Sequence, residues 1–180
     1  VPLRRLATRR FLATVVFTDI VGSTERAAEL GDRAWRDLLE RHHAVVRREL
    51  RAFHGREIGT AGDGFFALFE APERAVRCAL GICHRLADQQ ESEDARLRVR
   101  VGVTTGEALV SHDAVDSLDA VGDVVNTAAR LESAAPVDGV LVDEWVEVVP
   151  SAVETTGIAF HYDTPGAQAP QAVLVAVSPD

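Results

Sequence analysis

The sequence predicts an α/β sandwich in which helices cover a mixed sheet. Short apolar, β-rich runs alternate with amphipathic helical stretches in the order β-α-α-β-β-α-β-β-α-β, and single helical stretches connect the runs. The chain has 180 residues, of which 47% are hydrophobic and 26% charged, as in a soluble globular domain. We find no internal repeat and no domain boundary, which favours one core.

The N-terminal residues divide into a linker and a strand. Residues 1–10, VPLRRLATRR, carry four arginines and no hydrophobic pattern, so we expect a linker. Residues 11–18, FLATVVFT, are a short apolar run typical of a buried strand, which Asp19 ends. We therefore expect one folded domain over residues 11–180, excised from a longer chain because no Met begins the sequence.

Two helices are predicted after this strand. Gly22-Ser23-Thr24 opens a helical stretch that ends at Gly31, and Asp32 can cap a second, longer helix. The second helix has one apolar face, made by Trp35, Leu38, Leu39, Val45, Val46 and Leu50.

The middle of the chain predicts a hairpin, a helix and a strand. Residues 56–69 form two β-rich runs around Ala61-Gly62-Asp63-Gly64, and a Gly-Asp-Gly segment between such runs favours a hairpin. Residues 71–88 predict a third helix that begins at Pro72. Residues 96–110 alternate as a strand does and contain a Gly-Glu bend.

Shorter elements follow in the C-terminal part. Residues 111–120 are polar and acidic and predict a loop or arm, and residues 121–133 predict a helix. Residues 140–145, VLVDEW, predict a strand that enters a short helix. Two weaker strands are expected near residues 157–162 and 171–177.

Residue counts exclude several classes of function. The 28 acidic and 19 basic residues give a net charge of −9, which disfavours nucleic-acid binding and contact with a membrane surface. No apolar run reaches the roughly 20 residues of a membrane span. All 19 basic residues are arginines, so any mechanism that needs a lysine is excluded. Cys78 and Cys83 lie in an apolar helical stretch and predict buried thiols in a reducing, cytoplasmic location.

Two aspartates follow strands at points where chemistry is favoured. Asp19 lies directly before a helix start, whose free N–H groups favour a phosphate, and Asp63 lies at the hairpin tip. Each could instead be only a turn residue. Two strand-end carboxylates on neighbouring strands can share Mg²⁺ with phosphate oxygens, and two such ions can stabilise phosphoryl displacement.

Asn126 and Arg130 form a second candidate group on the predicted helix over residues 121–133. Their i,i+4 spacing places the amide and the guanidinium on one face. An arginine among alanines needs an anionic partner, which is either an internal carboxylate or a phosphate.

Four segments in order resemble the class III nucleotidyl cyclase catalytic domain. They are FTDIVGSTERAAELGD, GREIGTAGDGFFALF, RVRVGVTTGEALV and GDVVNTAARLESAAP, and the resemblance covers about residues 11–145. It implies a ferredoxin-like α/β fold with a palm-type mixed sheet. It also implies conversion of ATP or GTP to the 3′,5′-cyclic nucleotide and pyrophosphate, with two Mg²⁺ or Mn²⁺ ions per site. The family acts as head-to-tail dimers with sites at the interface, so we expect a homodimer.

The resemblance assigns the metal and phosphate ligands. Asp19 and Asp63 match the two metal-binding aspartates, and the carbonyl of Ile20 would complete the ligands of one ion. Arg100 matches a triphosphate-binding arginine. The loop that binds the terminal phosphates is matched by the backbone of Val21, Gly22, Ser23 and Thr24.

It also assigns the ribose, transition-state and base contacts. Asn126 matches the residue that orients the ribose, and Arg130 matches the arginine that meets charge developing at the α-phosphate. Both would come from the other subunit. Asp119 matches the acceptor of the adenine amino group, and a carboxylate, which only accepts, favours adenine over guanine O6.

Two family lysines are missing. Gly59 occupies the position of the purine-selecting lysine, four residues before Asp63, and the loss of that hydrogen bond costs about 1–3 kcal/mol in a desolvated site. The C-terminal phosphate-binding lysine is also absent, where the chain has TPGAQAP. We weigh three interpretations: an adenylate cyclase with a depleted base pocket, a degenerate domain that dimerises with little turnover, and a cyclase with relaxed ATP/GTP choice. The presence of Asp19, Asp63, Asn126 and Arg130 favours the first.

Overall fold

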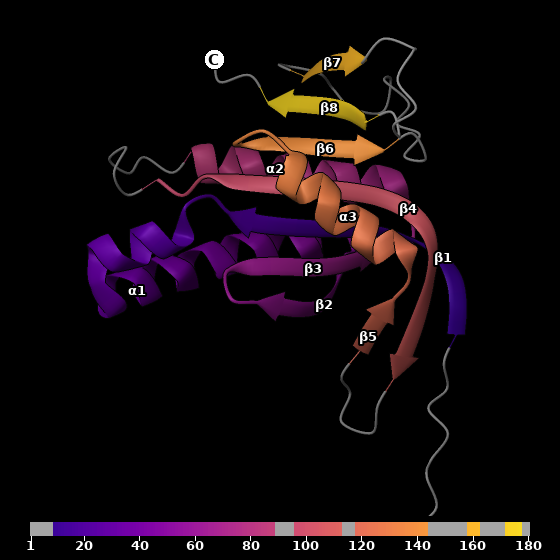
Figure 1. Cartoon of the computed structure of the whole chain (residues 1–180), viewed down its shortest axis with the longest axis horizontal. Helices are drawn as coiled ribbons and strands as arrows, with labels where there is room; N and C mark the ends of the chain where they lie inside the picture. Colours follow the sequence, from indigo (N-terminus) through magenta and orange to yellow (C-terminus); the bar gives the residue numbers. More distant parts are fainter. Residues whose placement is uncertain (1–8, 89–95, 113–117, 144–157, 163–171, 178–180) are drawn as a thin grey trace, which may run out of the picture.

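The computed structural model describes residues 9–88, 96–112, 118–143, 158–162 and 172–177 (Figure 1). Three helices lie in this part of the chain: α1 (Ser23–Ala52), α2 (Pro72–Ala87) and α3 (Asp123–Ala134). The strands are β1 (Arg9–Ile20), β2 (Arg56–Ala61), β3 (Gly64–Phe69), β4 (Val99–His112), β5 (Leu118–Val121), β6 (Gly139–Asp143), β7 (Ile158–Tyr162) and β8 (Ala172–Val177).

All strands join one mixed sheet. Their order is β2-β3-β1-β4-β6-β8-β7, and β5 pairs with β4 beside this path. The β4–β6 pair is parallel and the other pairs are antiparallel. The α/β class with a mixed sheet, predicted from the alternation of elements, is confirmed.

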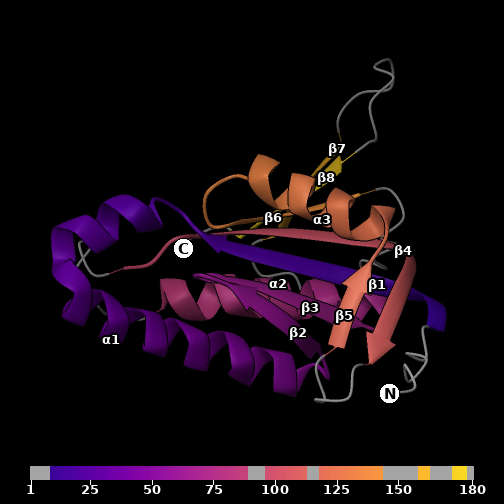
Figure 2. The ribbon, with the colours of Figure 1, turned by 60° about the horizontal axis from the view of Figure 1, so that its bottom comes forward.

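Helices cover both faces of the sheet. Figure 2 shows α1 and α2 on one face and α3 on the other. Side chains of β1 alternate accordingly, since Val16 and Ile20 join the core under α1 and α2, whereas Val15 and Phe17 pack toward α3. The part of β1 that leads to Asp19 is therefore buried on both faces.

Helix α1 contains the break that the sequence predicts. Gly31 has φ 76° and ψ 162°, which no helical residue adopts, so α1 is two helical segments joined at this glycine. Gly22, just before α1, has φ 68° in the left-handed region, which turns the chain from β1 into the helix.

Three features differ from the predicted elements or fall outside the described residues. β1 begins at Arg9, inside the predicted linker, because β1 continues to pair with β4 there. Residues 118–120, predicted as part of a loop or arm, and Val121, predicted as the start of a helix, together form β5, whose backbone pairs with β4. The short helix expected near residue 145 and the TPGAQAP segment lie outside the described residues.

The two cysteines are buried free thiols on α2, as predicted. Burial, with a smaller effect of Glu49, raises the pKa of the Cys78 thiol to about 12. Burial, reinforced by Asp138, raises that of Cys83 to about 12 as well. Among the described helices, none combines the length and the apolar character needed to cross a membrane.

Candidate active site

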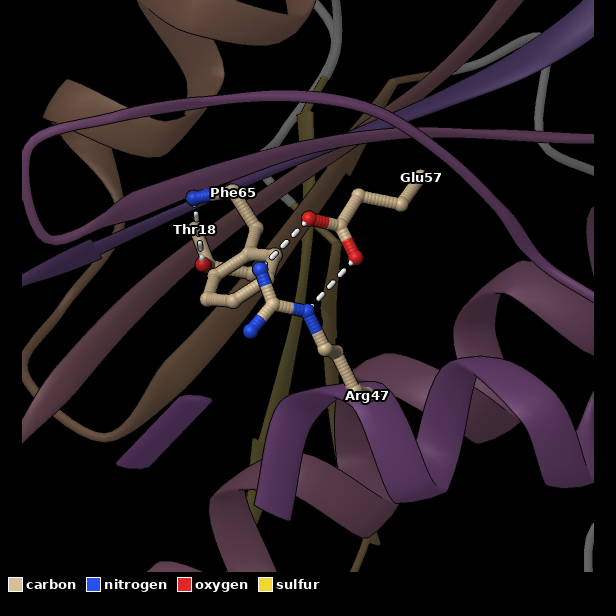
Figure 3. Close-up of polar contacts among 4 residues, drawn as sticks. All are labelled: Thr18, Arg47, Glu57 and Phe65. Atoms are coloured by element: carbon tan, nitrogen blue, oxygen red, sulfur yellow. Dashed lines mark hydrogen bonds and ion pairs between the residues drawn. The ribbon is translucent and has the colours of Figure 1, made fainter. Parts of the chain in front are cut away.

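The structure brings Asp19 and Asp63 together at one end of the sheet. Asp19 is the second-last residue of β1, and Asp63 lies in the turn that joins β2 to β3, where Gly62 has φ 67°. β3 pairs directly with β1, so the turn lies beside the end of β1. The Phe65 N–H donates a hydrogen bond of 3.2 Å to the Thr18 hydroxyl, which fixes the start of β3 against that end (Figure 3).

Helix α1 also contacts the β2–β3 hairpin, through Arg47. The Arg47 guanidinium binds both carboxylate oxygens of Glu57 at 2.9 and 2.8 Å, and its carbon lies 5.4 Å from the centre of the Phe65 ring (Figure 3). A bidentate pair of this kind is directional as well as attractive. It lowers the pKa of Glu57 through the hydrogen bonds and the charge of Arg47. The position of the Asp63 turn is therefore held by β1 and α1 together.

The two aspartates form an electrostatically unfavourable pair. Burial and then the charge of Asp63 raise the pKa of Asp19, against smaller opposing effects of the Ile20 backbone N–H and of Arg100. The Oδ2 atom of Asp63 is buried and has no hydrogen-bond partner among the described residues. Two adjacent carboxylates with an unpaired buried oxygen are chemically suited to divalent cations, whose preferred ligands are oxygens.

The described residues contain no group of three or more His, Cys, Asp or Glu side chains arranged to hold a metal ion. In the part of the chain that the structure describes, the side-chain ligands that this site offers are the two aspartates. Ile20, whose side chain is buried, can offer only its backbone. The remaining ligands of an ion would have to come from phosphate oxygens and water, as is usual for Mg²⁺.

The start of α1 provides amide donors next to Asp19. Val21 uses its N–H in a 2.9 Å bond to the Arg98 carbonyl, so this amide is occupied. No side chain caps the helix. The first amides of a helix have no partner within it, and here they belong to Ser23, Thr24 and Glu25.

Arg100 and Glu132 complete the surroundings of the aspartates. Arg100 pairs with Asp19 in the β1–β4 ladder, and its Nε is buried without a hydrogen-bond partner in the described structure. Burial and then the charge of Asp19 raise the pKa of Glu132, whereas its bond to Ser133 and the charge of Arg100 lower it. Sequence reasoning missed Glu132, because one glutamate on an amphipathic helix carries no distinguishing pattern.

Asn126 and Arg130 of α3 do not join the site that Asp19 and Asp63 form. Asn126 and Arg130 are both exposed, and the Arg130 guanidinium donates to the Thr127 hydroxyl at 3.2 Å. Arg130 lines a cavity of about 610 Å³ between α3 and the β4–β5 region, and neither Asp19 nor Asp63 lines it. Within the described residues Arg130 has no carboxylate partner, so the internal ion pair that the sequence left open is not formed.

The two base-reading positions lie on strands in contact. Gly59 of β2 pairs with Phe66, and a Cβ atom built at Gly59 would meet nothing within 4 Å. Phe66 stacks on Phe17 with ring centres 4.7 Å apart. Asp119 lies on β5, which contacts β2, and its backbone pairs with that of Ser111 on β4. The Asp119 side chain lies outside the described structure.

Comparison with known proteins decides the family. The model of the adenylate and guanylate cyclase catalytic domain matches residues 8–163. The chain belongs to this family. The resemblance stated from the sequence motifs is thereby confirmed.

Curated relatives of this cyclase domain are much longer. It is 32% identical over 141 residues to the adenylate cyclase of Lachancea kluyveri, covering 67% of this chain and 8% of that protein. It is 31% identical over 144 residues to the adenylate cyclase of Podospora anserina, covering 69% and 7% respectively. The chain spans less than a quarter of the length of the curated relatives it matches.

Solved cyclase domains share the fold. The adenylyl cyclase CyaB of P. aeruginosa superposes with a TM-score of 0.73 at 23% identity, covering 97% of this chain and 98% of that one. A dimeric guanylyl cyclase domain of Blastocladiella emersonii superposes with a TM-score of 0.79 at 18% identity, covering 93% and 97%. These likenesses confirm the predicted palm-type fold of the cyclase domain.

Proposed function

We propose that this domain is an adenylate cyclase that converts ATP to 3′,5′-cyclic AMP and pyrophosphate. One observation carries the proposal: Asp19 and Asp63 form a mutually repelling carboxylate pair, with an unpaired buried oxygen, beside the free amides that start α1. That arrangement suits cations bound to a triphosphate. The adenylate cyclase names of the curated relatives support the choice of reaction.

The metal ligands in this proposal are Asp19, Asp63 and the Ile20 carbonyl. Two Mg²⁺ or Mn²⁺ ions, when bound, would neutralise the triphosphate and favour ionisation of the ribose 3′-hydroxyl that attacks the α-phosphate. The residues fit this role, because the Asp63 Oδ2 has no competing donor in the described structure.

The triphosphate would lie between the start of α1 and Arg100. Free amides and the positive end of the helix dipole favour an anion there. Arg100 approaches from β4 with a guanidinium that forms no ion pair within the described part of the chain. The proposed phosphate loop is Val21, Gly22, Ser23 and Thr24, with the Val21 amide already bonded to Arg98.

A complete site would need a second copy of the chain. Asn126 and Arg130 are exposed on α3, and Arg130 lines a cavity that neither aspartate of the same chain lines. A head-to-tail homodimer would place them at the partner's nucleotide. Arg130 would then stabilise charge at the α-phosphate, and Asn126 would orient the ribose.

Asp119 would select adenine. Gly59 has no side chain, so the second contact to the base, which the family's lysine makes, is absent. The open space at Gly59 favours one alternative, a cyclase with relaxed ATP/GTP choice. The other alternative is a domain that dimerises and binds nucleotide with little turnover. In all three cases we place the domain at residues 11–180 and in the cytoplasm, with no nucleic-acid partner.

Incubation of the purified domain with ATP or GTP and Mg²⁺ or Mn²⁺, followed by chromatography, distinguishes these functions. We expect cyclic AMP as the main product. Equal rates with both nucleotides would favour relaxed choice. Nucleotide binding without cyclic product would favour the degenerate domain and overturn the proposed activity.

A further inference from the structure

Helix α3 lies directly on the backbone of β4. A Cβ atom built at Gly102 would lie 2.3 Å from both the Ala128 carbonyl oxygen and the Glu132 nitrogen. Only a glycine allows this approach, since real Cβ contacts are never so short. The main chain of Glu132 is therefore fixed over β4 by backbone contact.

The register of the sheet places Arg100 and Asp19 on the face that α3 covers, near its contact with Gly102. Arg100 precedes Gly102 by two residues, so both project on the α3 face of the sheet. Asp19 is the cross-strand partner of Arg100. Burial is the largest cause of the raised pKa of Glu132; beside it, the charges of Asp19 and, more weakly, Asp63 raise this pKa and the charge of Arg100 lowers it.

Glu132 contributes little to the fold through its carboxylate. Within the described residues its one hydrogen bond is accepted from the neighbouring Ser133 hydroxyl at 3.4 Å, and it forms no ion pair. A partly buried charge without a partner costs folding free energy. A cation bound at the neighbouring aspartates would attract the Glu132 carboxylate and so offset this cost.

We propose that Glu132 is a positioning residue that strengthens divalent-cation binding by Asp19 and Asp63 without being a ligand. Its negative charge acts through space on the bound ions. The inference rests on the proposed function, because it presumes that the two aspartates bind metal.

Titration of Mn²⁺ into the nucleotide-free domain, followed by electron paramagnetic resonance or calorimetry, tests the proposal. Glu132→Gln keeps the shape and removes the charge, so we expect its Kd for Mn²⁺ to rise roughly three- to tenfold. Glu132→Asp retains the charge and should stay closer to wild type. Glu73→Gln on α2 is the matched control, since the exposed Glu73 pairs with Arg77 on its own helix and its loss changes the net charge equally.

A second measurement separates this role from a structural one. Glu132→Gln should need more Mn²⁺ for half-maximal activity, yet approach the wild-type kcat at saturating Mn²⁺, with an unchanged thermal unfolding curve. An unchanged Kd in Glu132→Gln would overturn the inference and leave the proposed function intact. If the wild type lacks a Mn²⁺ site that Asp19→Ala abolishes, the proposed metal site and the inference both fail.

Discussion

Asp19 of β1 and Arg100 of β4 lie directly opposite each other in the antiparallel β1–β4 ladder. Despite this neighbour the pKa of Asp19 is raised, because burial and the charge of Asp63 outweigh the guanidinium. In the domain alone, Arg100 therefore does not offset the combined effect of burial and of the Asp63 charge on Asp19. Divalent ions bound together with a nucleotide would supply the missing positive charge.

Loss of either aspartate should abolish turnover. Asp19→Ala or Asp63→Ala removes one of the two side-chain metal ligands, and we expect cyclic AMP formation to fall by at least about 10²-fold. EDTA should abolish activity, and Mg²⁺ or Mn²⁺ should restore it. Glu73→Gln serves as the control variant. Wild-type rates in either aspartate variant would remove that residue from the mechanism.

Asp19→Asn should stabilise the metal-free domain at neutral pH. The pKa of Asp19 is higher in the folded than in the unfolded chain, so the folded state binds the proton more tightly. This group therefore reduces stability as pH rises from its unfolded pKa through its raised folded pKa. We expect a higher Tm for the variant near pH 7 and a difference that vanishes in acid. A lower Tm at pH 7 would contradict this sign.

Complementation tests whether sites are shared. Asp19→Ala and Arg130→Ala should each be inactive alone, since every site in either homodimer lacks one group. Mixed together, they should regain activity, because the heterodimer contains one intact site and one doubly defective site. Subunit exchange is verified with differently tagged chains. Exchange without recovery would argue against sites at the interface.

Base choice should depend on Asp119. Asp119→Ala should bring the ATP and GTP rates closer together more than it lowers the total rate, because the carboxylate repels guanine O6 and takes no part in the bond-making step. Gly59→Lys should lower the KM for ATP, since the space beside Gly59 is open. Steady-state kinetics with both nucleotides provide the measurement. A collapse of both rates in Asp119→Ala would indicate a structural role.

Gly102→Ala should destabilise the domain. The added methyl group would overlap backbone atoms of α3, which can move only by shifting the helix, and overpacking costs about 1–3 kcal/mol. Denaturant unfolding measures the loss. Gly59→Ala is the matched control, because the same methyl group meets nothing within 4 Å there. Equal stability of the two variants would show that α3 moves aside freely.

Local patterns predicted most of the elements and the aspartate pair. The apolar run of β1, the break at Gly31 and the Gly62-Asp63 turn are each determined by neighbouring residues, so they are visible in the sequence. The pairing of β1 with β3, which joins the two aspartates, follows once these elements are assembled into one sheet.

What the sequence did not reveal depends on contacts between distant segments. β5 has only four residues and forms by pairing with the end of β4. The Val21 N–H donates to the carbonyl of Arg98, which lies far along the chain, just before β4. Glu132 gains its neighbours only because α3 lies against Gly102.

The backbone contact at Gly102 also limits how such an enzyme could be regulated. No side chain lies between α3 and β4 at that point, so no rotamer change can alter their spacing. α3 and the sheet should therefore move as one rigid body. Their relative alignment is set during folding, so substrate binding does not lose entropy by ordering α3 against the sheet. In the head-to-tail dimer proposed above, an activating signal would then act by rotating whole subunits against each other, which changes the distance from Arg130 to the partner's aspartates and leaves each subunit internally unchanged.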